Sequence, residues 1–416
     1  MRLVVVVLAV AAMLLGTSAS AEQGRWETRL TLYSDQIDQA HWLIFDFVDE
    51  STGWLAASKL LRTRDGGLTW EAVSDLKPGA LDFVSPLEGW AADEVCEGAQ
   101  CVASVYHTLD GGGTWEKQTS HEGSLSRVVF VDEANGWVLL EFPRSILHTS
   151  DGGRTWREQP ALGGQIDTVR MAFVNANVVW AASKELAPDT PIRVFVSEDG
   201  GDSWRPAGEI DDRDGCGPQT LSAGDANHAW VVSLDCRERV KPFINRTVNS
   251  GAYWERVPLG GIGEVRYTRF FDAVQGVMVR AVCSETEIDR PCEDFLLRTT
   301  DGGVTWSTEP TGLQGGYFYS FLFMDPWHGW RGETIGGGQE PIAMEILQSY
   351  VGVPPQEPVS MPTVGSGRGG SSTTVTTAVL AALGVALIAI GRVWEHRRNS
   401  CRRPRSWHNG SMRARR

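Results

Sequence analysis

Thr63-Arg64-Asp65-Gly66-Gly67-Leu68-Thr69-Trp70 is a short polar stretch that recurs along this chain of 416 residues. Each copy has an Asp or Asn, at least one Gly and a closing Trp, and successive copies start 41 to 52 residues apart. Glycines tolerate the positive φ angles of a tight turn, and an Asp carboxylate can accept backbone N–H bonds inside it. We expect these residues to hold turns, because a catalytic group is built once and not in every repeat. The turn residues that begin the six copies are Asp65, Asp110, Asp151, Asp199, Asn249 and Asp301.

A second phrase precedes each turn and usually contains Phe, an acidic or amide residue and then Gly-Trp. Phe47 leads to Gly53-Trp54 in the first unit, and this phrase occurs seven times against six turns. The segment Arg25-Trp26-Glu27-Thr28 resembles the residues around a closing Trp, so it can supply what the last unit lacks. A repeat of this length with strand-like flanks is typical of propeller blades. The sequence therefore predicts an all-β fold, a seven-bladed β-propeller over residues 22–353 whose N-terminal strand closes the last blade.

Two further sets of side chains recur with these phrases, and we expect both at the interfaces between blades. A Trp offers a large apolar face for packing between sheets, and a basic residue before the turn Thr can stack on a neighbouring Trp. Strand alternation places the basic residues on one face in each blade. The Trp set is Trp54, Trp90, Trp137, Trp180, Trp230 and Trp330. The basic set is Arg62, His107, His148, Arg246 and Arg298.

The two ends of the chain have the composition of export and anchoring segments. Residues 1–21 combine one Arg, an apolar stretch and an Ala-Ser-Ala cleavage signal, the pattern of a secretory signal peptide. Residues 354–371 form a Pro/Gly/Ser-rich linker, and residues 372–391 contain no charge and are long enough to cross a bilayer as a helix. Residues 392–416 are rich in Arg, which predicts a cytoplasmic tail. We expect a cell-membrane protein with a single span and its propeller outside, in the periplasm or the extracellular space.

The charge of the exported part excludes one class of partner. Without the leader's Arg and the tail, the chain carries 28 basic and 51 acidic residues, a net charge of about −23. Such a domain repels phosphate, so we expect no nucleic acid partner. We expect the basic residues of the tail to fix its orientation on the cytoplasmic side of the membrane and to attract some anionic lipid.

The cysteines point to an oxidising compartment. Six of the seven lie in the exported part and one, Cys401, lies in the tail. Proximity in sequence favours three local disulfides, and no second Cys or His pair has the spacing of zinc ligands. We therefore expect no metal and no cofactor; an EF-hand calcium loop is also absent. The expected pairs are Cys96 with Cys101, Cys216 with Cys236, and Cys283 with Cys292.

The turn phrase resembles the Asp-box, or BNR repeat, of sialidases, sortilin-type receptors and certain glucanases. Together with the Phe-x-Asp and Gly-Trp phrases, it is most similar to the photosystem II stability/assembly factor family, over roughly residues 25–350, in the form of a bacterial membrane-anchored member. The resemblance implies a seven-bladed propeller that binds a membrane-protein subunit during assembly and performs no catalysis. The anchor and the cysteine pairs depart from that family and argue against a photosynthetic role. They leave a role beside a membrane or envelope protein complex.

Three arginines are the candidate binding residues. Arg127, Arg170 and Arg269 lie at or near the start of the first strand of their blades, and first strands line the channel of a propeller. In an acidic domain such a focus would attract an acidic peptide, a carboxylate or a phosphate. Scattered surface arginines are the alternative.

Other functions remain open. A carbohydrate-binding or glycoside-hydrolase propeller of the sialidase type would need two carboxylates or a Tyr nucleophile, and the Phe-Arg-Ile-Pro phrase of sialidases is absent. A sortilin-like receptor has the same topology, but the tail has no acidic or dileucine sorting signal. Gly369-Gly370 before the apolar run leaves open a bacterial sorting signal that would be cut to release the propeller. We predict a non-catalytic protein-binding propeller that assists assembly or stability of a membrane complex.

Overall fold

The computed structural model describes most of the repeat region. The residues described are 25–33, 44–98, 100–141, 144–160, 162, 166–185, 190–212, 217–235, 241–283, 292–314, 318–335 and 344–352. All of them belong to the first of two compact units, which ends at Pro354. Within these ranges no helix is long and apolar enough to cross a membrane. The predicted signal peptide, linker, membrane span and tail lie outside the described residues.

The described strands form seven four-stranded antiparallel sheets, which we number from 1 to 7 along the chain. Sheet 1 comprises β2 (Ile44–Phe47), β3 (Gly53–Ala56), β4 (Leu60–Thr63) and β5 (Glu71–Ser74). Sheet 2 comprises β6 (Ala80–Phe83), β7 (Gly89–Glu97), β8 (Gln100–Thr108) and β9 (Glu116–Glu122). Sheet 3 comprises β10 (Leu125–Phe130), β11 (Gly136–Glu141), β12 (Arg144–Thr149) and β13 (Arg157–Glu158). Sheet 4 comprises β14 (Ile166–Phe173), β15 (Val179–Glu185), β16 (Ile192–Ser197) and β17 (Arg205–Ile210).

The remaining three sheets follow the same plan, with one exception in the last. Sheet 5 comprises β18 (Pro218–Ala223), β19 (Ala229–Asp235), β20 (Lys241–Thr247) and β21 (Glu255–Pro258). Sheet 6 comprises β22 (Val265–Phe270), β23 (Gly276–Val282), β24 (Glu293–Thr299) and β25 (Ser307–Gln314). Sheet 7 comprises β26 (Phe318–Phe323), β27 (His328–Ile335), β28 (Met344–Val351) and β1 (Arg25–Tyr33). Strand β1 pairs with β28 in the register Trp26 to Tyr350, so the N-terminal segment completes the last sheet as predicted.

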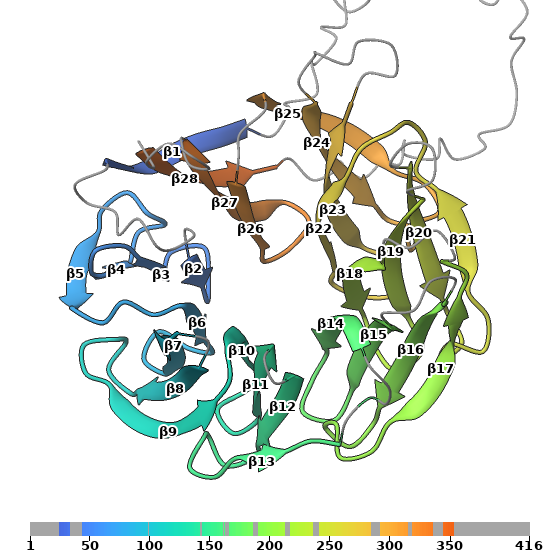
Figure 1. Cartoon of the computed structure of the whole chain (residues 1–416). Helices are drawn as coiled ribbons and strands as arrows, with labels where there is room; N and C mark the ends of the chain where they lie inside the picture. The colour runs from blue at the N-terminus through green and yellow to red at the C-terminus, as the bar shows by residue number, and fades with distance from the viewer. Residues whose placement is uncertain are drawn as a thin grey trace, which may run out of the picture. The chain divides into compact units, whose positions relative to one another are not determined.

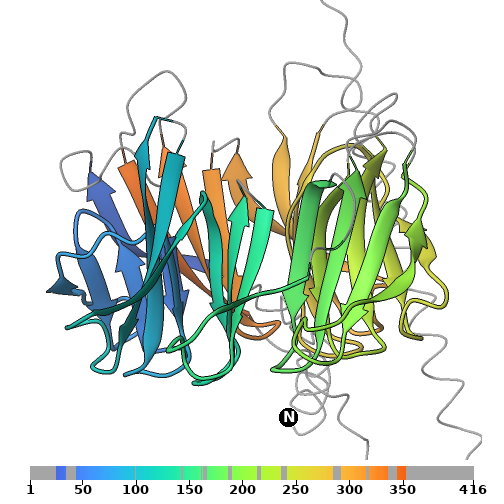
Figure 2. The ribbon, with the colours of Figure 1, turned by 60° about the horizontal axis from the view of Figure 1, so that its bottom comes forward.

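The sheets surround a central opening, with the first strand of each sheet innermost (Figure 1). In Figure 2 the strands stand side by side and the loops that connect them lie at their two ends. This arrangement is an all-β propeller, which confirms the fold class predicted from the repeats.

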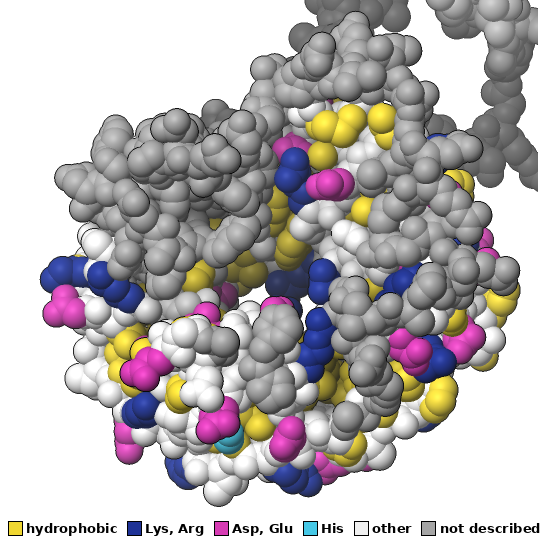
Figure 3. Space-filling model, in the orientation of Figure 1, with side chains coloured by type: hydrophobic (Ala, Val, Ile, Leu, Met, Phe, Trp, Pro, Cys, Tyr) yellow, Lys and Arg dark blue, Asp and Glu magenta, His cyan; other side chains and the backbone are white. Residues whose placement is uncertain are grey.

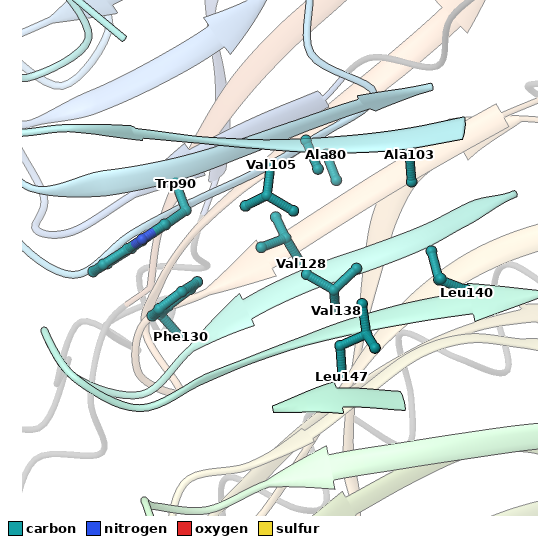
Figure 4. Close-up of a cluster of buried hydrophobic side chains, with 10 residues drawn as sticks. Ala80, Trp90, Ala103, Val105, Val128, Phe130, Val138, Leu140 and Leu147 are labelled. Carbon is teal, nitrogen blue, oxygen red and sulfur yellow. The ribbon is translucent and has the colours of Figure 1, made fainter. Parts of the chain in front are cut away.

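The core lies between neighbouring sheets and is organised around the repeated Trp. Between sheets 2 and 3, the ring of Trp90 stacks on the ring of Phe130 with centroids 3.5 Å apart (Figure 4). The indole Nε1 of Trp90 also donates to the carbonyl of Gly152, which belongs to the polar turn of sheet 3. Trp54, Trp137 and Trp230 make the same two contacts with the sheet that follows them. The six predicted Trp residues are all at most 3% exposed, which confirms them as core.

The basic residues before the turns also lie at the sheet interfaces, as predicted. His107 and His148 stack on the Trp opposite them in their own sheets. Arg62 and Arg246 instead donate to turn carbonyls of the next sheet, and each also binds a Glu of its own sheet. These side chains are therefore already engaged in holding the ring together.

Each polar turn is held by its own side chains. In the first turn, Asp65 Oδ1 accepts the backbone N–H of Thr69, and Asp65 Oδ2 accepts the Thr69 hydroxyl. The Thr63 hydroxyl oxygen accepts the N–H of Gly67, which closes the loop from the other side. These hydrogen bonds hold the pKa of Asp65 below its ordinary value. In the degenerate fifth turn, Ser250 adopts a φ of 58° where the other turns have Gly.

The interface between sheets 6 and 7 differs from the others because both partners of the repeated contact are missing. Sheet 6 has Val277 in place of the Trp, and sheet 7 has no polar turn. Instead, Gly352 N–H donates to the carbonyl of Trp327, the bond that a turn glycine makes in the other sheets. The Arg298 guanidinium reaches across to the carbonyl of Pro326 and lies over the rings of Trp327 and Tyr350. An arginine thus replaces the Trp at this interface.

Two glycines with similar backbone angles test how the turns are built. Gly66 (φ 69°) would place a Cβ 2.8 Å from the carbonyl oxygen of Glu50, whereas Gly98 (φ 66°) has no atom within 4 Å. Gly98→Ala should cost about 1–2 kcal/mol of unfolding free energy, the price of the left-handed conformation alone. Gly66→Ala should cost about 3 kcal/mol or more, because backbone must also move. Urea denaturation followed by circular dichroism measures both; equal losses would show that the close approach is unimportant.

Candidate binding site in the central channel

The inner strands bring one position of each sheet to the wall of the channel. This position is the next-to-last residue of the first strand. The residue two places before it lies on the same face of the strand. In sheet order its occupants are Asp46, Asp82, Val129, Ala172, Ser222, Arg269 and Leu322. Charged groups at this position are therefore confined to sheets 1, 2 and 6.

The polar side chains at this position link neighbouring inner strands. Asp46 Oδ2 accepts the backbone N–H of Phe83 at 2.7 Å, and Asp82 Oδ2 accepts that of Phe130 at 2.5 Å. Ser222 Oγ accepts the N–H of Phe270 at 2.8 Å in the same way. An inner strand has no further strand to pair with on its channel side, so these side chains satisfy backbone donors that would otherwise face the channel.

The two carboxyl groups are in an environment that disfavours their charge. Burial raises the pKa of Asp46 to about 6, although the N–H of Phe83 and the charges of Arg269 and Arg127 oppose the shift. Burial, together with the neighbouring charge of Asp46, raises the pKa of Asp82 well above its ordinary value. Removal from water penalises a carboxylate, and a second carboxylate nearby adds to the penalty. These two aspartates were not singled out in the sequence, where the signal was a carboxylate within an otherwise apolar strand.

Two of the three predicted binding arginines surround these carboxyls. Arg127 on β10 and Arg269 on β22 are exposed, and the charges of both act on Asp46 and Asp82. Within the described ranges neither guanidinium group makes a hydrogen bond or an ion pair, and Arg269 lies 5.4 Å from the ring of Phe271. A guanidinium group has five donors, so both can still bind an anionic ligand.

The third predicted arginine has a different environment. Arg170 on β14 donates from Nε to the carbonyl of Gln219 at 2.8 Å and from Nη1 to the carbonyl of Val169 at 3.0 Å. The charged groups that act on it are Glu141 and Arg144, not the channel aspartates. The structure thus places Arg127 and Arg269 in one cluster and Arg170 outside it.

The surface view agrees with this distribution. Figure 3 shows Lys and Arg side chains on the border of the central opening, whereas the rim carries both acidic and basic side chains. Basic groups on the border of the opening attract anions towards it.

Two of the three expected cysteine pairs lie at disulfide distance. Cys96 faces Cys101 across the hairpin of β7 and β8, and Cys283 is bonded to Cys292. Cys216 and Cys236 lie outside the described residues. The first bond joins paired strands of sheet 2, and the second joins residues that flank strands β23 and β24 of sheet 6.

Two clusters in the described part of the chain have the composition of a metal site, and one of them, Glu94 with Cys96 and Cys101, contains disulfide-bonded cysteines. The ligand atoms of Glu50, Asp325 and His328 lie within 4.8 Å of one another. His328 Nδ1 lies 2.7 Å from Asp325 Oδ2. The same Asp–His pair occurs at Asp225 and His228, with 2.9 Å between Nδ1 and Oδ2. We assign these pairs to the geometry of the loops, and the absence of a metal stays a prediction.

Comparison with known proteins identifies the fold class. No protein-family model and no curated protein matches the sequence. The structure of YCF48 bound to D1 peptide is similar with a TM-score of 0.51 and 18% identity, over 80% of this chain and 99% of that chain. YCF48 from Cyanidioschyzon merolae gives 0.50 and 15%, over 79% and 98%. A GH74 xyloglucanase from Xanthomonas campestris gives 0.49 and 14%, over 77% and 55%. The chain is a β-propeller.

The channel carboxyls predict a pH dependence of stability. Because the folded-state pKa of Asp46 is raised to about 6, the folded protein holds a proton there that the unfolded chain has lost. This contribution favours folding at pH 4–5 and disappears as the pH rises through about 6. Asp46→Asn keeps an acceptor for Phe83 N–H and removes the charge, so it should raise the unfolding temperature at pH 7.5 more than at pH 5. Thermal unfolding at the two pH values measures this; an equal shift at both would contradict it.

Proposed function

We propose that this chain is an extracytoplasmic binding protein without catalytic activity that holds an acidic segment of a membrane or envelope protein in its channel. In that role it assists the assembly or stability of the complex to which the segment belongs. The observation that carries the proposal is the pair of exposed guanidinium groups of Arg127 and Arg269 in a domain of net negative charge. Arginine suits this task because its fork of donors binds carboxylates with two parallel hydrogen bonds.

A structural neighbour supports binding of a peptide by this fold. The neighbour with the TM-score of 0.51 is YCF48 with a bound D1 peptide, so a propeller of similar backbone can hold a peptide. At 18% identity the likeness concerns the fold, and the partner of this chain follows from its own residues. Those residues select a ligand with negative charge.

The position of the protein in the cell is the second part of the proposal. We infer a seven-bladed ring closed by β1, cleavage after residue 21, and retention by a span at 372–391 with a cytoplasmic tail. The two cysteine pairs at disulfide distance support an oxidising compartment for the ring. The charge asymmetry across the apolar run supports the orientation.

A glycoside hydrolase is the second candidate, and one observation favours it. Asp46 and Asp82 are neighbouring carboxyls with raised pKa values, as an acid–base pair would have. Against it, one oxygen of each carboxyl is occupied by a backbone N–H. Release of sugars from a panel of polysaccharides that Asp82→Asn abolishes would establish the enzyme and overturn the binding proposal.

Capture of partners tests the binding proposal. The full-length protein is crosslinked mildly in its native membranes, purified by affinity, and its partners are identified by mass spectrometry. A double variant, Arg127→Glu with Arg269→Glu, should recover at least about tenfold less partner, because two charge-assisted contacts become repulsive. Its unfolding temperature, measured at the same pH as the capture, checks that the variant is still folded.

A matched control separates the channel from net charge. Arg64→Glu with Arg154→Glu makes the same change in charge on two polar turns, and should leave capture unchanged. Equal recovery with both double variants would remove the channel arginines from the proposal.

The single tail cysteine tests the topology. Cys401 should react with a membrane-impermeant maleimide only after the cells are permeabilised, because the tail lies inside. Leu68→Cys adds a thiol at a side chain that is 66% exposed in the ring, and it should be labelled in intact cells. Labelling of Cys401 in intact cells would contradict the proposed orientation.

A further inference from the structure

The channel holds its two arginines beside two acids, and this arrangement has a consequence for when a ligand can bind. Asp46 and Asp82 lie on the adjacent inner strands β2 and β6, and Arg127 and Arg269 lie on β10 and β22. The carboxyls are bound to neighbouring backbone N–H groups, so they are fixed in the wall and cannot swing away. The charges of Arg127 and Arg269 act on both carboxyls, so a ligand bound by these arginines is also affected by the charge of the two aspartates.

Few other charges face this cluster. Among the inner strands, β18 and β26 contain no Asp, Glu, Lys, Arg or His. On β14, Arg170 is held by carbonyl oxygens near Glu141 and Arg144. On β22, Arg266 is paired with Asp294 at 2.9 Å. Among the described side chains of the inner strands, the charges that act on one another in this part of the channel are thus those of two arginines and two carboxyls.

The sum of these charges changes with pH. When both carboxyls are ionised, the four groups have no net charge, and a ligand carboxylate meets as much repulsion as attraction. When both are protonated, the cluster carries two positive charges. Burial raises the pKa of Asp46 to about 6 and that of Asp82 well above its ordinary value, whereas an exposed ligand carboxylate stays ionised down to about pH 4. Between these values the channel is positive and the ligand is negative.

We propose that protonation of Asp46 and Asp82 switches the channel from a weak to a strong binding state for an acidic peptide segment. The inference rests on the proposed function, because it assigns a control to the same site. No atom moves in this step except the protons taken from solvent. By reciprocity, a bound acidic ligand makes both carboxyls easier to protonate, so binding takes up protons.

Calorimetric titration of the full-length protein with a capped hexa-aspartate peptide tests the inference. Titrations are made at pH 5, 6, 7 and 8 and constant ionic strength. The Kd of the wild type should fall about tenfold from pH 8 to pH 5, the order expected when a like charge is removed close to the ligand. Titrations near pH 6 in buffers of different ionisation enthalpy should show net proton uptake.

Two double variants separate the effect of the channel carboxyls from the effect of the protein's net charge. Asp46→Asn with Asp82→Asn keeps an acceptor for each backbone N–H, and it should bind tightly at pH 8 with little dependence on pH. Asp75→Asn with Asp202→Asn changes net charge equally outside the channel, and should keep the wild-type dependence. If the channel variant retained the full dependence, or the wild type showed none while binding, the switch would be refuted and the binding site would stand. Absence of binding at every pH in all proteins would refute the proposed function, and the switch with it.

Discussion

The contact between a Trp and the following sheet is the interaction on which the ring depends. In one contact the indole covers a Phe of the next sheet and donates a hydrogen bond to its turn. Trp90 does both with Phe130 and Gly152. Burial of the two rings supplies the apolar stabilisation, and the hydrogen bond fixes the rotation of one sheet against the next. Since Trp54, Trp90, Trp137 and Trp230 each make this hydrogen bond to the sheet that follows, the polar turns are part of the packing between sheets as well as ends of hairpins.

The interface between sheets 6 and 7, which lacks the Trp contact, supports this dependence of the ring on it. Sheet 7 has no polar turn to accept the bond, and the sheet before it has Val277 where the Trp would stand. Arg298 spans this interface instead, through the carbonyl of Pro326, the carboxylate of Glu309 and two aromatic rings. The first and last described strands, β1 and β28, pair in sheet 7, so the sheet that is assembled from distant segments is joined to sheet 6 by a different, more polar contact.

The channel shows how the same scaffold acquires a site. Every inner strand has a position where a side chain can reach the N–H of the next strand, and most occupants are small or apolar. Aspartates at this position in sheets 1 and 2 satisfy backbone donors and are held in an environment that raises their pKa values. Arg269 occupies the same position in sheet 6 and has no partner there within the described ranges. Three of the four charged groups at the site, Asp46, Asp82 and Arg269, therefore lie at the same repeated position of their inner strands.

The sequence by itself determined the repeats, the fold class and the partner of the N-terminal strand, because these follow from local patterns. Gly-Gly turns such as Gly66-Gly67, alternating strands and a missing final strand can all be counted along the chain. The sequence also indicated Arg127, Arg170 and Arg269 as candidate binding residues, but it did not distinguish among them. Only the tertiary structure separated them, since the carbonyl of Gln219 that binds Arg170 comes from another sheet. It alone showed the role of Asp46, because burial raises its pKa and the charges of Arg127 and Arg269, from two other sheets, oppose that shift, and neither effect is encoded in the neighbouring residues.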